Sequence, residues 1–218
     1  MSGRVESVTD LAERVRAAAS ARPADQRYVL GIAGPPGAGK STLAEALCAE
    51  LGPATARIAP MDGFHLTNAE LRARAALARK GEPDTFDAAG YVAALRRLRL
   101  LGDPVPWPTF DRALEEPTEA GVVFTDEPIA VTEGNYLLAD GPWAPVRPLL
   151  DACWYLDADR PDLERRLLDR HLRGGRTPAA AHTKVHDSDL PNADLVARTR
   201  HRADLVLRPD ADHYRLLG

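Results

Sequence analysis

The sequence contains little cysteine, and this scarcity limits the kinds of site that it can form. Only two of the 218 residues are cysteines, Cys48 and Cys153, and both lie in apolar patterns far apart in the chain. We therefore expect buried free thiols in a reducing compartment rather than a disulfide framework. Because no Cys-x-x-Cys pair is present, the sequence offers no zinc-binding pattern.

Long apolar runs and an excess of basic charge are also missing. No stretch approaches the length of a membrane span, and residues 1–6 lack the apolar segment of a signal peptide. The net charge of −4 and the pI near 5.9 give no sign of a basic nucleic-acid surface. We predict a cytoplasmic globular protein with no nucleic-acid or membrane partner, forming one domain over residues 1–218.

The strongest positive signal is a phosphate-binding loop. Residues 34–42 match the pattern G-x-x-x-x-G-K-[ST] at every required position. Glycines let successive backbone N–H groups point into one concavity that holds phosphate oxygens. The alternative, a glycine-rich turn that binds no ligand, is the weaker interpretation. Lys40 brings a cation to the outer phosphates, and Ser41 can ligate the Mg²⁺ that accompanies a nucleoside triphosphate. The predicted nucleotide-binding residues are Gly34, Pro35, Pro36, Gly37, Ala38, Gly39, Lys40, Ser41 and Thr42.

Strand and helix patterns alternate along the whole chain. A buried run at 28–33 leads into the phosphate loop, and apolar residues at helical spacing follow the loop up to Gly52. This alternation predicts an α/β fold of the P-loop NTPase type, with a parallel five-stranded sheet flanked by helices on both faces. Further strands are expected at 56–61, 129–132, 152–156 and 203–207, with edge strands at 104–111 and 121–124. Helices are expected at 7–21, 67–80, 87–101, 143–150 and 159–172, and after Thr177 and Pro191, with Ser7, Thr67, Asp87 and Asp159 as caps.

Two carboxylates follow predicted strands, at the sheet edge where open α/β folds bind ligands. Asp62 is a candidate general base that takes the proton of a substrate hydroxyl while its oxygen attacks a γ-phosphate. The alternative is an ordinary turn residue before Gly63. Glu133 is a candidate Mg²⁺ partner, and its alternative is a solvated loop residue.

An arginine set near the C-terminal third predicts a cationic lid. Arg166, Arg170 and Arg173 are spaced by four and three residues, so they share one helix face beside a Gly-Gly hinge. Arginines closing over the transferring phosphoryl oxygens would stabilise transition-state charge. Arg166 and Arg170 are candidate catalytic residues, and Arg173 is a candidate nucleotide-binding residue. The competing interpretation is a solvated face paired with Asp162, Glu164 and Asp169.

Several polar and aromatic residues at loop positions are candidates for the acceptor pocket, although ordinary loop packing is an equal alternative for each. His65 stands near Asp62 and is expected to line this pocket. His182 and His186 are four residues apart, but a pair without further ligands is more typical of a surface than of a metal site. The predicted substrate-binding residues are Asp62, Phe64, His65, Lys80, Phe110, Asp111, Arg112, Asn135 and Tyr136.

The motifs together resemble a known family. The phosphate loop is followed by Met-Asp-Gly-Phe-His at 61–65, Lys-Gly-Glu-Pro-Asp-Thr-Phe-Asp at 80–87, Pro-Thr-Phe-Asp-Arg at 108–112 and Thr-Glu-Gly-Asn-Tyr at 132–136. In this order they resemble the uridine kinase, type I pantothenate kinase and phosphoribulokinase group. The chain looks most similar to bacterial nucleoside/nucleotide kinase family proteins, some associated with fructose transport.

The resemblance implies roles for matching residues. It places the general base at Asp62, the Mg²⁺ partner at Glu133 and the lid arginines within 166–176. We expect a lid over about 165–190 and a substrate-side insertion over about 64–120.

The predicted function is an ATP- and Mg²⁺-dependent kinase that phosphorylates a hydroxyl of a small metabolite. A nucleoside-like molecule is the favoured phosphoryl acceptor, followed by a fructose-type sugar or a pantothenate-like alcohol. A nucleoside monophosphate kinase stays open, because nearby arginines supply cations for an acceptor phosphate. A nucleotide-binding switch is the remote alternative, since no Asn-Lys-x-Asp guanine signature is present. The sequence also leaves open whether the protein forms a homodimer.

Overall fold

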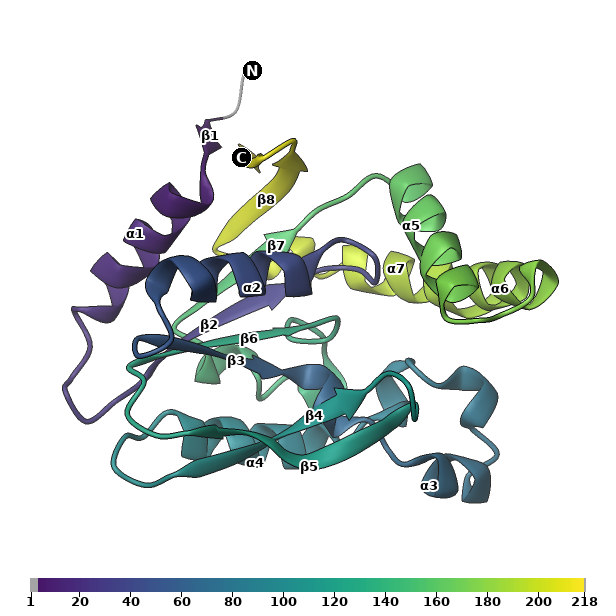
Figure 1. The fold of residues 1–218 in the computed structure, drawn as a ribbon, viewed down its shortest axis with the longest axis horizontal. Coiled ribbons are helices and arrows are strands. Elements are labelled where there is room, and N and C mark those ends of the chain that lie inside the picture. The colour runs from purple at the N-terminus through teal and green to yellow at the C-terminus, as the bar shows by residue number, and fades with distance from the viewer. Residues whose placement is uncertain (1–3, 218) are drawn as a thin grey trace.

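The computed structural model describes residues 4–217, which form a seven-stranded sheet with helices on both faces (Figure 1). The strand order is β1-β9-β8-β7-β2-β6-β3. The five strands from β8 to β3 run parallel, as predicted, and two antiparallel strands that the sequence analysis missed extend the β8 edge. The strands are β1 (Val5–Glu6), β2 (Tyr28–Ala33), β3 (Ala56–Pro60), β6 (Ile129–Gly134), β7 (Ala152–Leu156), β8 (Leu205–Asp210) and β9 (His213–Leu217).

Alternating side chains of the central strand β2 fill two separate cores. Leu30 and Ile32 belong to the core under α1, α2 and α5, whereas Val29 and Ala33 belong to the core over α4. Burial on both sides explains why this strand is a continuous apolar run in the sequence. The helices on the first face are α1 (Val8–Ala19), α2 (Lys40–Leu51) and α5 (Arg160–Arg173), and α4 (Ala88–Leu98) lies on the second.

Most of the predicted capping residues hold the first turn of a helix. Ser7 and Thr67 each form a complete capping box, at the start of α1 and of α3 (Asn68–Ala73). Asp159 stands in the cap position of α5 without a capping bond, because its carboxylate pairs with Arg208. The other side-chain caps are Asp87 on α4 and Thr177 on α6 (Pro178–Lys184).

Two of the predicted helices are wrong in length or type. The helix expected over 67–80 ends at Ala73, because Ala75 has a φ of 52° and turns the chain. The helix expected over 143–150 is two short 3₁₀ turns, because closely spaced prolines remove the amide donors of an α-helix. The 3₁₀ turns in these regions are Leu77–Arg79, Gly141–Trp143 and Arg147–Leu149.

The two expected edge strands pair with each other instead of joining the main sheet. β4 (Val105–Asp111) and β5 (Glu116–Phe124) form an antiparallel hairpin beneath the edge strand β3 (Figure 1). The indole of Trp107 donates a hydrogen bond of 2.9 Å to the Pro60 carbonyl at the end of β3. The hairpin is thereby anchored next to Asp62.

The C-terminal third contains the segment expected as a lid. α5 and α6 lie side by side, and a π-helical turn at Val185–Asp189 leads from α6 into α7 (Leu190–Ala197) (Figure 1). Within residues 4–217, no helix is both long and apolar enough to cross a bilayer.

Both cysteines are free, as predicted. Cys153 is buried in β7, and Cys48 is half-buried on α2. Burial raises the pKa of each thiol to about 12, so both stay protonated near neutral pH.

Candidate functional site

The phosphate loop connects the carboxyl end of β2 to the first turn of α2. Its glycines have positive φ angles, 153° at Gly34, 82° at Gly37 and 100° at Gly39. A Cβ atom at Gly34 would lie 2.5 Å from the carbonyl oxygen of Leu156, so the approach of β7 requires glycine there. The free amides at the start of α2 attract anions. The loop therefore has the backbone shape and polarity that polyphosphate binding needs.

Lys40 is buried and folds across this loop. Its Nζ donates to the Pro35 carbonyl at 3.0 Å and to Oδ1 of Asn135 at 2.8 Å. Burial lowers the pKa of Lys40, and the nearby carboxylates of Glu133 and Asp62 oppose that shift. Both hydrogen-bond partners are neutral oxygens, so a charged phosphate oxygen is a stronger partner for the ammonium. Asn135, expected in the acceptor pocket, is instead bound to Lys40.

Ser41 and Glu133 form an oxygen-rich corner next to the lysine. The Ser41 hydroxyl donates to the Glu133 carboxylate at 3.0 Å. Burial, and then the charge of Asp62, raise the pKa of Glu133. A hydroxyl and a carboxylate are the hard ligands that Mg²⁺ prefers, and this ion usually takes few protein ligands beside substrate phosphates. Within residues 4–217, no cluster of three or more His, Cys, Asp and Glu side chains is suited to a metal, which agrees with a site that has few protein ligands.

Asp62 lies one strand away from Glu133, just past the end of β3. Because β3 and β6 are parallel neighbours, with Pro60 paired to Glu133, their carboxyl ends bring the two acids to the same edge. The Asp62 side chain is 34% exposed, and its carboxylate lies 3.8 Å from Nη2 of Arg112. It is thus accessible to a ligand while remaining close to the phosphate loop.

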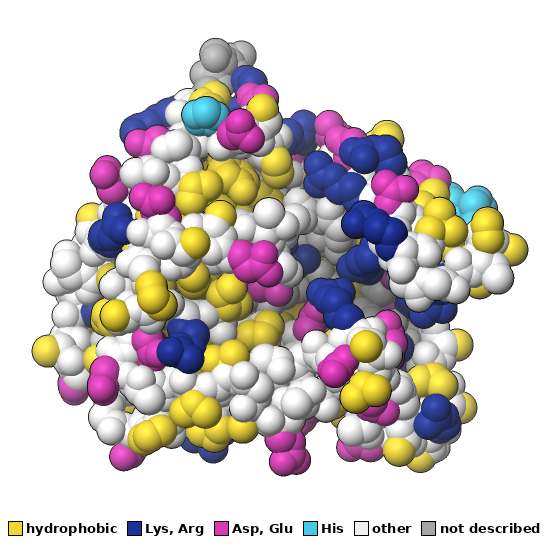
Figure 2. All heavy atoms as spheres, viewed as in Figure 1, with side chains coloured by type: hydrophobic (Ala, Val, Ile, Leu, Met, Phe, Trp, Pro, Cys, Tyr) yellow, Lys and Arg dark blue, Asp and Glu magenta, His cyan; other side chains and the backbone are white. Residues whose placement is uncertain are grey.

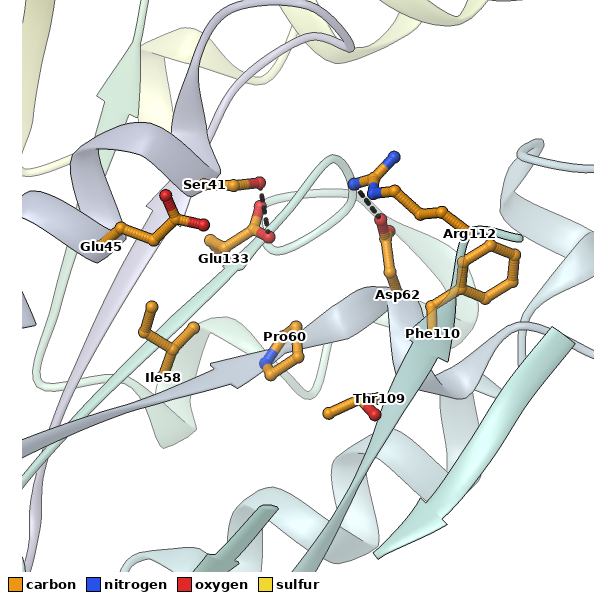
Figure 3. Close-up of a pocket in the computed structure, with 9 residues that line it drawn as sticks. All are labelled: Ser41, Glu45, Ile58, Pro60, Asp62, Thr109, Phe110, Arg112 and Glu133. Atoms are coloured by element: carbon orange, nitrogen blue, oxygen red, sulfur yellow. Dashed lines mark hydrogen bonds and ion pairs between the residues drawn. The ribbon is translucent and has the colours of Figure 1, made fainter. Parts of the chain in front are cut away.

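A pocket of about 200 Å³ joins these parts (Figure 3). Its walls come from α2, β3, β6 and the β4–β5 hairpin, so it links the nucleotide loop to the substrate-side insertion. Figure 3 shows the Ser41–Glu133 pair and the Asp62–Arg112 pair on facing sides of the same space. The lining residues are Ser41, Glu45, Ile58, Pro60, Asp62, Thr109, Phe110, Arg112 and Glu133.

His65 is held in an aromatic stack beside Asp62. Its ring centroid lies 3.9 Å from that of Phe86 and 4.7 Å from that of Phe110. The Nδ1 atom is 2.8 Å from the Asp62 carbonyl, which can only accept, so Nδ1 carries the proton. Burial lowers the pKa of His65 and keeps the ring neutral. The Nε2 atom is therefore available to accept a hydrogen bond from a substrate hydroxyl.

Two residues expected in the acceptor pocket point elsewhere. Phe64 is 9% exposed and packs edge-on against Tyr91 and Trp107 in the core over α4. Tyr136 is fully buried, and its hydroxyl donates to the Gly81 carbonyl at 2.5 Å. Phe64 ends a 3₁₀ turn and Tyr136 follows the end of β6, and both rings are directed into the core.

Two more of the expected pocket residues support the wall instead of lining it. The carboxylate of Asp111 accepts from the amides of Ala113 and Leu114, so it shapes the hairpin turn. Lys80 binds Oδ1 of Asn68 at 2.7 Å and lies 5.0 Å from the centre of the Phe110 ring. Lys80 thereby anchors the aromatic wall.

The predicted lid arginines separate into two groups. Arg166 lies 3.3 Å and 3.4 Å from the carbonyl oxygens of Gly37 and Ala38 in the phosphate loop. Arg170 is exposed and lies close enough for its charge to favour a lower pKa at Lys40. Arg173, by contrast, bonds back to the Asp169 carbonyl of its own helix.

Positive side chains gather along the hollow between α5 and the hairpin, as Figure 2 shows. The solvated pairing considered as an alternative is present for Arg165, which contacts Asp162 at 3.1 Å. His182 and His186 stack at 4.0 Å, and His186 contacts Glu164 at 3.2 Å, without forming a metal cluster among residues 4–217. One helix thus has a cationic face toward the loop and a paired face toward solvent.

Sequence reasoning missed four of the residues that line the pocket: Ile58 and Pro60 of β3, and the polar residues Glu45 and Thr109. Glu45 lies one helical turn after Ser41, and this spacing of four residues would have placed it on the same face of α2. Thr109 lies just before Phe110 on a strand whose register shifts between Trp107 and Thr109. Pro108 lies between these two residues, and a proline inside a strand is the signal that could have located the irregularity.

Comparisons with known proteins find relatives along most of the chain. The model of the ATPase family associated with various cellular activities (AAA) matches residues 30–86, the segment with the phosphate loop and Asp62. Protein YggC of Escherichia coli (strain K12) is 34% identical over 187 residues, which cover 84% of this chain and 78% of YggC. A candidate uridine kinase of Schizosaccharomyces pombe, C227.14, is 33% identical over 196 residues, covering 84% and 83%. A pantothenate kinase of Mycobacteroides abscessus is 30% identical over 212 residues, covering 85% and 68%.

Solved structures show the same architecture. A candidate fructose transport system kinase from Silicibacter sp. TM1040 superimposes with a TM-score of 0.81 at 36% identity, covering 91% of this chain and 98% of its own. D-glycerate 3-kinase from Cryptococcus neoformans, at 14% identity and a TM-score of 0.70, shares the fold alone. The predicted P-loop fold and the resemblance drawn from the motifs are therefore confirmed. The chain belongs to the P-loop kinase family that includes uridine kinase-like proteins and pantothenate kinases.

Proposed function

We propose that the protein is a kinase that transfers the γ-phosphoryl group of ATP to a hydroxyl of a small metabolite. One observation carries this proposal: the phosphate loop, the Ser41–Glu133 pair and Asp62 converge on a single pocket of about 200 Å³. Family membership supports ATP as the donor, since the relatives are named as kinases. The pocket supports an acceptor of metabolite size.

Each residue has a distinct role in the proposed reaction. Amides of the phosphate loop and Lys40 hold the triphosphate. Asp62 accepts the proton from the acceptor hydroxyl as its oxygen bonds to the γ-phosphorus and the bond to the ADP oxygen breaks. Arg166 and Arg170 neutralise charge that spreads over the phosphoryl oxygens.

Mg²⁺ fits the Ser41 hydroxyl and the Glu133 carboxylate by the chemistry of these ligands. When bound, it would supply charge neutralisation to the phosphate oxygens. We assign the segment at about 165–190 as the lid over the triphosphate and residues 64–120 as the acceptor side of one domain. Arg173 is the weakest of the proposed lid contacts, because it bonds to its own helix.

A nucleoside-like acceptor remains the first choice of substrate class. Phe110 lines the pocket, and His65, tilted by 43° to it, offers one neutral acceptor nitrogen, which together suit a ring with hydroxyl groups. A sugar is the second candidate, supported by the similarity to the candidate fructose transport system kinase.

A nucleoside monophosphate is a weaker candidate than a neutral acceptor, because two of the cations near the acceptor side, Arg79 and Lys80, are already engaged. Arg79 bonds to Glu82 and Asp84, and Lys80 bonds to Asn68. The cation that lines the pocket is Arg112, and its contact to Asp62 is loose, at 3.8 Å.

An ATP-consumption screen tests the proposal. Nucleosides, sugars, pantothenate, glycerate and nucleoside monophosphates are each incubated with the protein, ATP and Mg²⁺, beside the Asp62→Asn variant as a blank. We expect at least one hydroxyl acceptor to yield ADP and a phosphate ester with the native protein only. Equal ATP consumption by the variant would contradict the role of Asp62, and a nucleoside diphosphate product would favour the monophosphate alternative.

A further inference from the structure

A buried polar cluster joins the acceptor-side loop 79–86 to the proposed lid. At its centre is Lys184, the last residue of α6, with 17% of its side chain exposed. Its Nζ lies 2.9 Å from the Lys80 carbonyl, 2.7 Å from Oγ of Ser188 and 3.6 Å from the Asp189 carboxylate. The ammonium thus donates two hydrogen bonds, one of them to the acceptor-side loop, and forms an ion pair with Asp189.

The cluster continues into the helix that carries the lid arginines. Asp189 is 9% exposed, and its second oxygen lies 2.6 Å from Nε2 of His171 on α5. His171 directly follows Arg170 on that helix. Asp189 ends the π-helical turn, a feature that often marks functional positions in helices. Lys184 is therefore connected to α5, the helix that carries the predicted lid arginines, through one carboxylate.

The other end of the cluster leads back to the phosphate loop. The Gly81 carbonyl, one residue after Lys80, accepts the Tyr136 hydroxyl at 2.5 Å. The residue before Tyr136 is Asn135, which binds Nζ of Lys40. With the contacts of Arg166 to the carbonyls of Gly37 and Ala38, the path closes into a ring around the site. The ring passes in turn through the phosphate loop, the end of β6, loop 79–86 and the lid.

The choice of lysine at this corner is informative. Of the 28 lysine and arginine residues in the chain only three are lysines, and two of them, Lys40 and Lys184, place their ammonium groups on this ring. Lys80 joins the ring through its backbone carbonyl. An ammonium is a compact point donor that fits a corner of three oxygens, whereas guanidinium is a planar fork. Burial lowers the pKa of Lys184, and Asp189 opposes the shift, so the charge is held by its partners.

We propose that Lys184 is a positioning residue that fastens the acceptor-side loop to the lid, so that nucleotide binding also orders the acceptor wall. The inference rests on the proposed function. A triphosphate that draws Arg166 and Arg170 onto the phosphate loop would move α5, and Lys184 transmits this to the Lys80 carbonyl. Loop 79–86 ends in Phe86, which stacks on His65 beside Asp62. The acceptor pocket is thereby completed when the lid is in place.

Hydrogen exchange of the full-length protein, with and without AMP-PNP and Mg²⁺, tests this without an identified acceptor. The variants are Lys184→Met and, as matched control, Thr183→Met at the exposed neighbouring position. We expect nucleotide to slow exchange at 34–42 and at 79–86 in the native protein and the control. In Lys184→Met, nucleotide should slow amide exchange only at 34–42. The affinity for AMP-PNP should stay within about threefold of the native value, because the phosphate loop is unchanged.

The outcomes separate this inference from the proposed function. If nucleotide fails to slow exchange at 34–42 in the native protein, the proposed function fails. If it slows 34–42 but leaves 79–86 unchanged in the native protein, or slows both equally in Lys184→Met, the role of Lys184 is wrong. Should Lys184→Met not fold, Asp189→Asn removes the connecting charge at constant volume and is expected to give the same loss at 79–86. Equal slowing in Asp189→Asn would then overturn the proposal.

Discussion

The proposed nucleotide side and the proposed acceptor side of the site are built in different ways. The nucleotide side consists of the phosphate loop and Glu133, and its functional groups sit on a strand end and a helix start. The acceptor side consists of residues 64–120, and its polar groups mostly bind one another: Lys80 binds Asn68, and Asp111 caps its own turn. The first is therefore preset by local backbone shape, whereas the second depends on packing between distant segments.

The largest expected effect concerns the residue between the two sides. Asp62→Asn removes the proton acceptor but keeps the size and shape of the side chain, so turnover should fall by about 10³-fold. AMP-PNP affinity should stay within about twofold, because the phosphate loop is unchanged. Steady-state rates and a binding titration measure both quantities, with Asp103→Asn in an exposed turn as control. Near-normal turnover of Asp62→Asn would show that Asp62 is not the general base.

A change on the nucleotide side comes next. Lys40→Met removes the buried ammonium and should weaken ATP binding by about 100-fold, because a charge-assisted contact to phosphate is lost. Acceptor affinity should change much less, since Lys40 binds only Pro35 and Asn135 on its own side. Calorimetric titration with ATP and Mg²⁺ measures the effect. An unchanged affinity for ATP would mean that the loop does not hold the nucleotide.

A change on the acceptor side should show the reverse pattern. Phe110→Ala removes one half of the stack around His65 and should raise the acceptor KM by about tenfold, with the ATP KM nearly constant. Leu114→Ala, at a 70% exposed position of the same hairpin, is the matched control. If Phe110→Ala raises both KM values alike, the two sides are not separable as described.

The smallest expected effect is a pH dependence of Mg²⁺ binding. The pKa of Glu133 is raised by burial, so in the absence of metal its proton persists at pH values above the ordinary 4.5 of the group. The protonated Glu133 side chain therefore contributes to the free energy of unfolding below pH 4.5. This contribution is lost as the pH rises through the raised pKa of Glu133. Mg²⁺ must displace the proton, so its affinity should fall with falling pH, by less than about tenfold per pH unit.

Titration of Mg²⁺ against the AMP-PNP complex at several pH values measures this dependence. Glu133→Gln is the reference, because it has no proton to displace and should bind Mg²⁺ more weakly but with a flat profile over the same window. The same slope in both proteins would show that another group controls the effect.

The same contrast explains what the sequence could predict. The phosphate loop, Asp62 and Glu133 follow from local rules, because a parallel strand end fixes where the next residue lies. The helix expected over 67–80 failed at Ala75, whose positive φ has no sequence signal. Phe64 and Tyr136 were assigned to the pocket, yet both rings lie in the core.

Long-range pairing accounts for the other differences. The cap expected from Asp159 is replaced by an ion pair with Arg208, which lies in a distant strand. The hairpin strands were expected as edge strands of the sheet, but they pair with each other. The Lys184 cluster unites four segments far apart in sequence, so only the fold reveals it.

A crystal structure with AMP-PNP and Mg²⁺ tests the central claim most directly. The account predicts the β- and γ-phosphates within the amides of residues 34–42, Mg²⁺ beside Ser41 and Glu133, and the carboxylate of Asp62 facing the γ-phosphate across the pocket. A triphosphate bound away from this loop, or an Asp62 side chain turned away from its last phosphate, would contradict it.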